Sequence, residues 1–242
     1  MPVSLSIVIP AYNEERRLPP TLDRILEYLK SEGFSDWEVL VVDDGSRDRT
    51  ADVVRHYGAS DERIQLIENP GNRGKGYAVR SGMLQAVKDW VLVTDADLSA
   101  PIEELSRLTD GVRLQDAAVA IGSRAVDRSL VTVHQPAFRE FSGRFFNIVM
   151  RLVTGMPFRD TQCGFKLFRR DAAQAVFSRQ RIEGFGFDVE DLMIARTLGF
   201  KVIEVGVRWA NVEGTKVSLA SGLRSFSDVF LVRWYQLMGR YR

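Results

Sequence analysis

The chain has 242 residues, of which 45% are hydrophobic and 27% are charged, a composition typical of a globular protein that buries a full core in one large domain. Its formal net charge of +1 argues against a protein dedicated to binding nucleic acid. The single cysteine, Cys163, excludes an intramolecular disulfide and is typical of a reducing compartment.

Residues 1–15 begin directly with a strand pattern. They lack the basic start and the long apolar run of a secretory signal, so we expect no such signal. No window approaches 18 uncharged apolar residues, and the nearest candidate, FFNIVMRLV, carries Asn147 and Arg151. We therefore predict a chain that does not span a membrane but can lie on one.

The first half of the chain alternates between strand and helix patterns. Short apolar runs predict strands, and apolar residues at helical spacing predict the helices between them. The predicted strands cover residues 4–10, 37–46, 63–68, 91–93 and 117–124, and the predicted helices cover 18–30, 50–57, 77–87 and 101–112. This alternation indicates an α/β fold with a mainly parallel sheet and helices on both faces.

The second half, from about residue 127, is less regular. Its patterns predict an amphipathic helix over 139–154, a loop over 155–168, helices over 171–178 and 188–198, a strand over 201–209 and a terminal helix. No proline-rich linker or internal repeat divides the halves, so we predict a single domain over 1–242.

Polar residues follow three of the predicted strands. Asp95 and Asp97 follow one strand, Asp43 and Asp44 end another, and the sequence PAYNE closes the first. An isolated D-x-D is most simply a solvated strand end with an Asx turn. Three polar ends in one parallel sheet instead favour a ligand site, because ligands bind beyond the carboxyl ends of such strands. Mg²⁺ or Mn²⁺ takes one or two carboxylates and fills its other positions with water and phosphate oxygens.

The glycine-rich segment 69–82 does not match a nucleotide triphosphate loop. Gly71 and Gly74 have the wrong spacing for G-x-x-x-x-G-K-[ST], and Tyr77 follows Gly76. G-x-G-x-x-G is also missing after the first strand, where a dinucleotide-binding fold requires it. These patterns argue against a nucleotide triphosphatase and a dehydrogenase.

Several motifs occur in the order seen in family-2 glycosyltransferases of the GT-A fold. They are SIVIPAYNEE, VLVVDDGSRDRT, NRGKGYAVRSG, VTDADLS and GSR, followed by DTQCGFKLF, GFGFDVED and VEGTKVS. This set resembles the polyprenyl- and dolichyl-phosphate hexosyltransferases, and most closely their dolichyl-phosphate β-glucosyltransferase branch. The related mannose synthases tend to carry glutamine and proline after D-x-D, whereas Ser99 and Pro101 follow it here.

The resemblance implies a Rossmann-like GT-A fold with a nucleotide-sugar-binding half (1–125) and an acceptor-binding half (126–242). It implies transfer of glucose from UDP-glucose to dolichyl or polyprenyl phosphate, with inversion and with Mg²⁺ or Mn²⁺ as cofactor. The alternatives are GDP-mannose as the donor, or a family member with a hydroxyl acceptor. A binding protein without catalysis would not need two apposed carboxylates, and a nucleotidyltransferase would need a glycine-rich loop after the first strand.

The resemblance also implies donor-site residues. Asp97 would ligate the metal with Asp95 beside it, and either Asp43 or Asp44 would hold the uracil and ribose. The full implied set for the nucleotide sugar is Pro10, Tyr12, Glu14, Asp43, Asp44, Lys75, Asp95, Ala96 and Asp97.

The acceptor side is implied to be cationic, because a lipid phosphate is already anionic and needs positioning rather than a base. Arg124, Arg139 and Lys216 match the basic positions of the family, and the implied catalytic residues are Asp97, Arg124 and Asp191. Asp191 matches the carboxylate that acts as base towards hydroxyl acceptors. In a competing interpretation Asp188 is a helix N-cap, and Glu190 and Asp191 are there because the helix dipole favours acidic residues in the first turn.

Two amphipathic helices bear on location. Apolar stripes with flanking arginines run along 141–153 and along the tail from Leu223 to Tyr241. Such helices can pack on the sheet, form a homodimer, or lie in a membrane interface. With a lipid acceptor, we expect a cytoplasmic protein with C-terminal interfacial helices, attached peripherally to the cytosolic face of a membrane.

Overall fold

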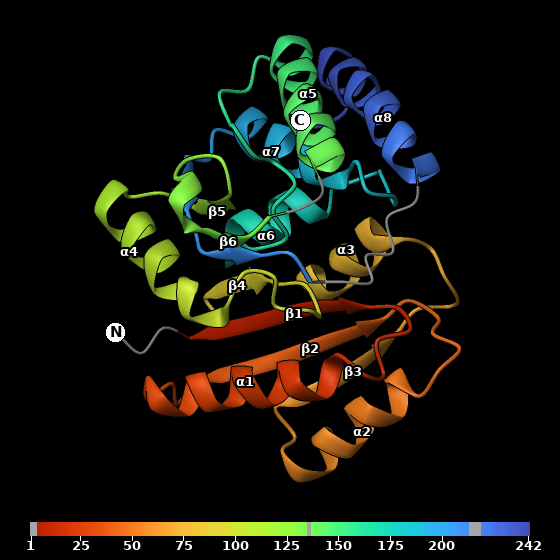
Figure 1. Cartoon of the computed structure of the whole chain (residues 1–242), viewed down its shortest axis with the longest axis vertical. Coiled ribbons are helices and arrows are strands. Elements are labelled where there is room, and N and C mark those ends of the chain that lie inside the picture. Colours follow the sequence, from red (N-terminus) through yellow and green to blue (C-terminus); the bar gives the residue numbers. More distant parts are fainter. Residues whose placement is uncertain (1–3, 135–136, 213–218) are drawn as a thin grey trace.

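A seven-stranded sheet forms the centre of the computed structural model, which describes residues 4–134, 137–212 and 219–242 (Figure 1). Its strands are β1 (Leu5–Ala11), β2 (Trp37–Asp43), β3 (Ile64–Glu68), β4 (Trp90–Val93), β5 (Val119–Ser123), β7 (Lys166–Arg169) and β8 (Val202–Gly206). Their spatial order is β3-β2-β1-β4-β7-β5-β8, and among the described strands of this sheet only β7 is antiparallel to its neighbours. The predicted mainly parallel sheet is confirmed.

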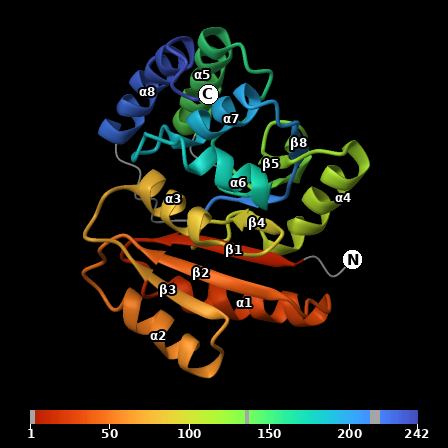
Figure 2. The same cartoon turned by 180° about the vertical axis from the view of Figure 1, so that it is seen from behind.

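Helices cover both faces of this sheet (Figures 1 and 2). They are α1 (Leu18–Ser31), α2 (Thr50–Ser60), α3 (Lys75–Gln85), α4 (Leu105–Gln115), α5 (Ala137–Thr154), α6 (Arg170–Phe177), α7 (Phe187–Thr197) and α8 (Leu219–Leu237). Apolar residues of α1, α2 and α4 form one core cluster with the sheet, and those of α3, α6 and α7 form another. Each predicted helix is therefore present.

The central strands are buried on both faces. In β1, Ile7 and Ile9 belong to the core cluster on the α1 side, and Val8 between them belongs to the cluster on the α3 side. Successive side chains of a strand point to opposite faces, so both faces need an apolar residue. This is why the parallel strands are continuous apolar runs in the sequence.

Two assignments from the sequence, one loop and one strand, are wrong. The predicted loop 155–168 contains the start of β7, which inserts between β4 and β5 with Lys166 opposite both Val93 and Ile121. This strand has four residues with a basic residue at each end, too few for a period to be recognised. The predicted strand 201–209 is also divided, because β8 ends at Gly206 and β9 (Trp209–Ala210) pairs with β6 (Val131–Val133) in a separate sheet.

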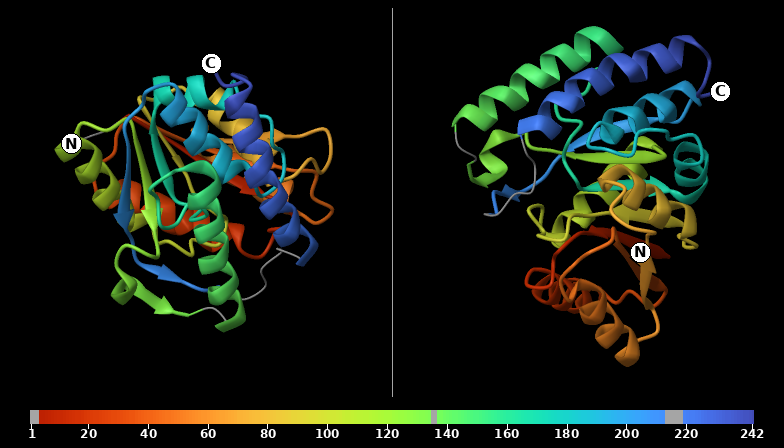
Figure 3. Two further views of the ribbon diagram at one scale, coloured as in Figure 1. Left: turned by 90° about the horizontal axis from the view of Figure 1, so that it is seen from above. Right: turned by 90° about the vertical axis from the view of Figure 1, so that its right-hand side faces the viewer.

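Helices α5 and α8 lie side by side at the end of the molecule opposite α1 and α2 (Figures 1 and 3). Phe146 and Met150 of α5 and Val229 and Val232 of α8 are buried in the core, so each helix packs through one face. The described helices include none whose length and hydropathy would let it cross a bilayer. The predicted tail stripe is wrong at Tyr241, which is fully buried after α8 ends.

Gly82 in α3 tests the packing of this helix on the sheet. A Cβ on Gly82 would lie 2.4 Å from Val8 Cγ1 and 2.9 Å from Val42 Cγ2, so we expect Gly82→Ala to lower the free energy of unfolding by about 1–3 kcal/mol. Gly143, within α5, is the matched control, because a Cβ there meets no described atom within 4 Å. Gly143→Ala should stabilise the protein by up to about 1 kcal/mol. Equal effects of the two substitutions in urea unfolding would contradict this packing.

Candidate active site

Most of the predicted site residues that the structure describes lie at one edge of the sheet. Strands β2, β1, β4 and β5 all end there, and the antiparallel strand β7 begins there. Along this edge, in strand order, lie Asp43 at the end of β2 with Asp44 after it, Tyr12 after β1, Asp95 and Asp97 after β4, Lys166 at the start of β7, and Arg124 after β5. Parallel strands therefore bring together residues from 10 to 124 that are distant in sequence.

The loops after β1 and β2 are fastened to each other. The Asn13 backbone N–H donates to Ser46 Oγ at 2.8 Å, and the Glu14 N–H donates to Thr50 Oγ1 at 2.8 Å. Pro10, Tyr12 and Glu14 are half-buried along this junction. A cavity of about 270 Å³ opens beside it, lined by Asn13, Glu14, Glu15, Arg16, Arg17 and Asp48.

The two aspartates at the end of β2 are both buried but make different contacts. Asp44 uses both carboxylate oxygens to hold the segment before α3: it accepts from Asn69 Nδ2 at 2.9 Å, the Arg73 N–H at 3.1 Å and the Gly74 N–H at 2.7 Å. Asp43 accepts from Ser46 through Oδ1, and its Oδ2 accepts no hydrogen bond from any described residue. Asp43 therefore keeps an oxygen for a ligand, whereas Asp44 orders the loop.

The loop that Asp44 holds leads into α3, and Lys75, the first residue of α3, contacts Asp95. Lys75 Nζ lies 2.6 Å from Asp95 Oδ1. Burial lowers the pKa of Lys75, but the carboxylates of Asp95 and Asp188 raise it by more, so the net pKa lies above its usual value and the ammonium stays charged. Within the described residues, the cation that neutralises Asp95 is thus a lysine that the chain itself supplies.

The D-x-D carboxylates lie in a turn that follows strand β4. Strand β4 ends at Val93, and the Leu98 N–H donates to the Asp95 carbonyl oxygen at 3.2 Å. Asp97 Oδ1 accepts from the Ser99 N–H at 3.0 Å. Gly164 closes over Asp95, because a Cβ on Gly164 would lie 2.2 Å from Asp95 Oδ2.

This arrangement fits a divalent cation. Asp95 and Asp97 are half-buried carboxylates at the carboxyl edge, and Gly164, which has no Cβ, allows the chain to pass directly against the Asp95 carboxylate. The described residues contain no group of three or more acidic, His or Cys side chains that could hold an ion alone. Mg²⁺ needs only one or two protein carboxylates when phosphate oxygens and water complete its shell, so Asp95 and Asp97 are a sufficient protein contribution.

A buried ionic cluster that the sequence did not predict lies next to Asp95. Lys166, 3% exposed, forms an ion pair with Asp188, 5% exposed. The helix begins at Phe187 after Gly186, and its first turn has no side-chain cap, so the interpretation of Asp188 as an N-cap is wrong. The sequence signal for this buried ion pair was a lysine within the apolar run GFKLF. It indicates a buried lysine only if this run is known to be an inner strand of the sheet.

Asp191 lies one turn beyond Asp188 in α7 and is 1% exposed. Its Oδ1 has no hydrogen-bond partner among the described residues. Burial raises the pKa of Asp191 well above its ordinary value, and the carboxylates of Glu190 and Asp188 raise it further against the opposing effect of Lys166. Glu190 instead accepts from the Ile182 N–H at 2.7 Å and from Tyr241 Oη at 2.8 Å, which makes it a structural residue.

Arg124, after β5, is held by Asp160. Its Nε lies 2.7 Å from Asp160 Oδ2 and its Nη2 lies 2.8 Å from Oδ1, a bidentate pair. Burial lowers the pKa of Arg124, but Asp160 raises it by more, so the guanidinium is charged. The other two predicted acceptor residues are not placed: Lys216 and the side chain of Arg139 lie outside the described residues.

A larger cavity, of about 390 Å³, lies away from these residues. It is lined by Tyr28, Glu32, Glu103, Glu104, Ser106, Arg107 and Arg208. Glu104 is nearly fully buried there, and its carboxylate already contacts Arg107 and Arg208. None of the residues predicted for the site lines this cavity, so the carboxyl edge of the sheet remains the candidate site.

Comparisons with known proteins match this chain over most of its length. The family model described as glycosyl transferase family 2 matches residues 6–177. A dolichyl-phosphate beta-glucosyltransferase of Homo sapiens is 36% identical, covering 98% of this chain and 77% of its own length. One of Trichomonas vaginalis is 37% identical over 95% of this chain and 73% of its own length. One of Saccharomyces cerevisiae is 32% identical over 99% and 77%.

Solved structures share the fold. The crystal structure of glucosyl-3-phosphoglycerate synthase from Mycobacterium tuberculosis with Mn²⁺, UDP-glucose and phosphoglyceric acid has a TM-score of 0.69 and 18% identity, covering 96% of this chain and 80% of its own. Mannosyl-3-phosphoglycerate synthase from Rubrobacter xylanophilus also has a TM-score of 0.69, with 18% identity over 98% of this chain and 75% of its own. These similarities confirm the GT-A-type α/β architecture expected from the motifs.

The buried Asp191 carboxyl predicts a pH-dependent stability. Its folded-state pKa is raised above the unfolded value near 4, so its contribution is fully favourable below that value and is lost as pH rises through the folded pKa. Asparagine does not titrate. We therefore expect Asp191→Asn to be more stable than the wild type by about 1–3 kcal/mol at neutral pH, with the gain vanishing in acid.

Urea unfolding at several pH values between about 4 and 8 measures this difference. Asp110→Asn is the control, because the Asp110 side chain is 64% exposed and its loss should change stability by no more than about 0.5 kcal/mol. A stability gain for Asp191→Asn that does not depend on pH would contradict the raised pKa.

Proposed function

The chain belongs to glycosyl transferase family 2, and we propose that it transfers glucose from UDP-glucose to dolichyl or a related polyprenyl phosphate, with inversion at the anomeric carbon. The observation that carries this proposal is the similarity to dolichyl-phosphate beta-glucosyltransferases over 95–99% of the chain at 32–37% identity. The alternative donor, GDP-mannose, has less support, because these relatives carry the name of glucosyltransferases.

The order of side chains along the sheet edge supports this assignment. Carboxylates that can bind a nucleoside lie after β2, the D-x-D pair lies after β4, and a charged arginine lies after β5. A donor bound with its base at β2 and its diphosphate at β4 would direct its sugar towards Arg124. We propose that residues 1–125 bind the donor and that residues 126–242 supply the acceptor side.

We assign the nucleoside to Asp43 rather than Asp44. The Oδ2 of Asp43 accepts no hydrogen bond from the described residues, while both oxygens of Asp44 hold residues 69–74. Pro10, Tyr12 and Glu14 border the same junction and would line the nucleotide pocket. The resemblance also implied Ala96, but its side chain is buried in the core cluster on the α1 side and its carbonyl oxygen accepts from Thr21 Oγ1 at 2.7 Å. Lys75 carries its charge beside Asp95 and is available to a diphosphate oxygen.

Asp95 and Asp97 would hold the Mg²⁺ or Mn²⁺. When bound, this cation would act as a Lewis acid that neutralises the charge developing on the departing nucleoside diphosphate. The chain contributes Lys75 to the same task, because its ammonium is held within reach of Asp95 by the loop that Asp44 orders.

The transfer itself needs no protein base. An oxygen of the lipid phosphate attacks C1 of glucose, the bond from C1 to the β-phosphate oxygen breaks, and UDP leaves with the electron pair. Arg124 would hold the attacking phosphate through its remaining N–H groups. Burial and the neighbouring carboxylates raise the pKa of Asp191, which favours its uncharged form, and an uncharged carboxyl repels an anionic acceptor less than a carboxylate does; we assign Asp191 to positioning.

The activity assay uses the purified full chain, Mn²⁺, labelled nucleotide sugars and a short polyprenyl phosphate. We expect transfer from UDP-glucose, and we expect Asp97→Asn to reduce it by about 100-fold or more, because the substitution keeps volume but removes the charge that binds the metal. Asp110→Asn should retain full activity. Turnover with GDP-mannose alone would overturn the donor assignment, and full activity of Asp97→Asn would overturn the metal assignment.

We further propose that the α5–α8 surface attaches the protein to a membrane. Large apolar side chains are exposed at helical spacing on both helices: Phe138, Phe141, Phe145, Ile148 and Leu152 on α5, and Phe230, Leu231, Trp234 and Leu237 on α8, which Met238 directly follows. Exposed Arg144 and Arg151 lie on α5 beside them. A paired apolar face with basic flanks is suited to a membrane interface with anionic headgroups, and a lipid acceptor requires such a location.

Liposome flotation tests this surface. Phe141 is 70% exposed and Leu152 is 80% exposed, so Phe141→Glu with Leu152→Glu should preserve the fold and weaken binding to phosphatidylcholine–phosphatidylserine vesicles by about tenfold or more. Leu114→Glu on α4, where the side chain is 78% exposed, is the matched control and should float like the wild type. Unchanged flotation of the double variant would contradict the proposal. Loss of a dimer in that variant would assign the face to a second copy.

A further inference from the structure

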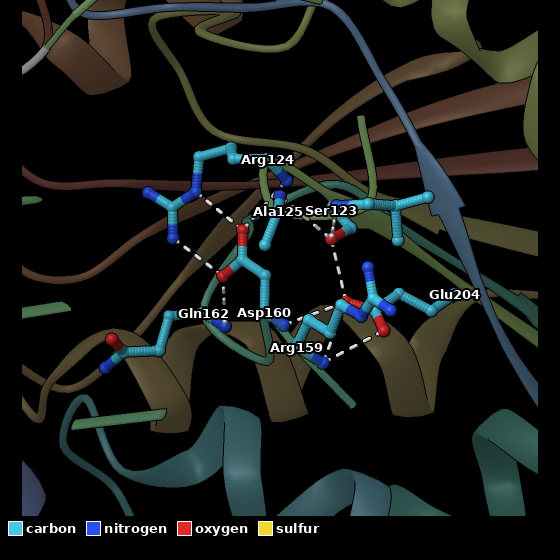
Figure 4. A network of polar contacts seen from close by, with 8 residues as sticks. Ser123, Arg124, Ala125, Arg159, Asp160, Gln162 and Glu204 are labelled. Carbon is cyan, nitrogen blue, oxygen red and sulfur yellow. Dashed lines mark hydrogen bonds and ion pairs between the residues drawn. The ribbon is translucent and has the colours of Figure 1, made fainter. Parts of the chain in front are cut away.

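We propose that Asp160 and Glu204 are positioning residues that hold the Arg124 guanidinium ready for the acceptor phosphate. The inference rests on the proposed function, because that function makes a phosphate the ligand of Arg124. Neither carboxylate needs to touch a substrate. Figure 4 shows how the two carboxylates are connected: Asp160 accepts hydrogen bonds from Arg124, and Glu204 accepts hydrogen bonds from the backbone of Asp160 and Arg159.

The contact between Arg124 and Asp160 is nearly complete on the carboxylate side. Asp160 is 2% exposed and accepts three hydrogen bonds from Arg124: from the backbone N–H at 3.0 Å, from Nε at 2.7 Å and from Nη2 at 2.8 Å. Two contacts to the guanidinium and one to the backbone of the same residue fix both ends of the side chain. The Trp209 ring, 5.3 Å from Arg124 Cζ, borders the guanidinium from β9.

The geometry leaves part of the guanidinium for a ligand. A guanidinium has five N–H donors, and Asp160 takes the one on Nε and one on Nη2. The remaining three N–H groups donate to no described residue, and the Arg124 side chain is 27% exposed. An anion that approaches from solvent would therefore meet a charged group whose direction is already set, which reduces the ordering cost of binding.

Asp160 in turn depends on Glu204. The segment between α5 and β7 has no regular structure to hold Asp160 in place. Glu204 of β8 accepts from the Asp160 N–H at 2.8 Å, the Arg159 N–H at 2.9 Å and Ser123 Oγ at 2.7 Å (Figure 4). Ser123 precedes Arg124, so one carboxylate fastens both segments that form the ion pair.

These contacts predict a selective kinetic effect. Loss of the Asp160 charge would release the guanidinium without altering the donor residues after β1, β2 and β4. We expect Asp160→Asn to raise the KM for polyprenyl phosphate, and its Kd measured directly without UDP-glucose, by about 10- to 100-fold. The KM for UDP-glucose should stay within about twofold of the wild type. A merely structural loss would affect both substrates or the amount of folded protein.

Three further variants sharpen the experiment. Arg159→Gln is the matched control, because Arg159 contributes its backbone N–H to Glu204 and its side chain can change without loss of that contact. Glu204→Gln keeps one acceptor oxygen and should give a smaller rise in the acceptor Kd, in the same direction. It replaces Asp160→Asn as the deciding variant if Asp160→Asn does not fold. In an Arg124→Lys background, Asp160→Asn should add little, since residues that act as one unit are not additive.

The outcomes separate the two proposals. No glucose transfer by the wild type would overturn the proposed function, while the Kd for polyprenyl phosphate would still decide the role of Asp160 and Glu204. An unchanged acceptor Kd in folded Asp160→Asn would overturn the inference. So would equal rises for donor and acceptor, full additivity with Arg124→Lys, or failure of the wild type to bind polyprenyl phosphate at all.

Discussion

Carboxylates are concentrated at the carboxyl edge of the sheet, and each of three key ones lies beside a cation from another segment of the chain. Lys75 pairs with Asp95, Lys166 with Asp188, and Arg124 with Asp160. Lys166 and Asp188 are nearly fully buried, so either charge without the other would be strongly destabilising, and a group of carboxylates without cations would be destabilising along the whole edge. The interleaving of charges is therefore the condition under which the acidic site can exist. It also fastens α3, α7 and the segment before β7 to the sheet.

The same pairs suit a reaction between two phosphate-bearing substrates. A cationic side chain that is paired with a carboxylate has a fixed orientation and keeps its remaining N–H donors. The carboxylate also neutralises part of its charge, so it can orient a phosphate without binding it irreversibly. Arg124 shows this in the clearest form, since Asp160 occupies two of its N–H groups and leaves three. Lys75 has a similar place beside Asp95, where the donor diphosphate is proposed to bind.

The antiparallel strand β7 determines the centre of this edge. Because β7 runs opposite to its neighbours, its first residue, Lys166, lies beside the last residue of β4, Val93. A parallel strand would have placed its carboxyl end there instead. The reversal thus inserts a lysine between the D-x-D turn after β4 and Arg124 after β5. Gly164, two residues earlier, lets the chain pass against the Asp95 carboxylate.

The sequence alone determined the α/β class and, within the part of the chain that the structure describes, the α-helices and most strands, because the apolar period and the helix ends are local properties. It also determined the family, because its motifs keep their order along the chain. Tertiary structure alone decided which carboxylates are free and which are held: Asp44 and Glu190 are used by the backbone, whereas Asp43 and Asp191 each retain an oxygen without a partner among the described residues. It also decided that residues 166–169 form the strand β7, and it decided the contacts of Lys166, Asp160 and Glu204. The physical reason is that charge pairing and strand insertion depend on which distant segments meet, and no local pattern records that.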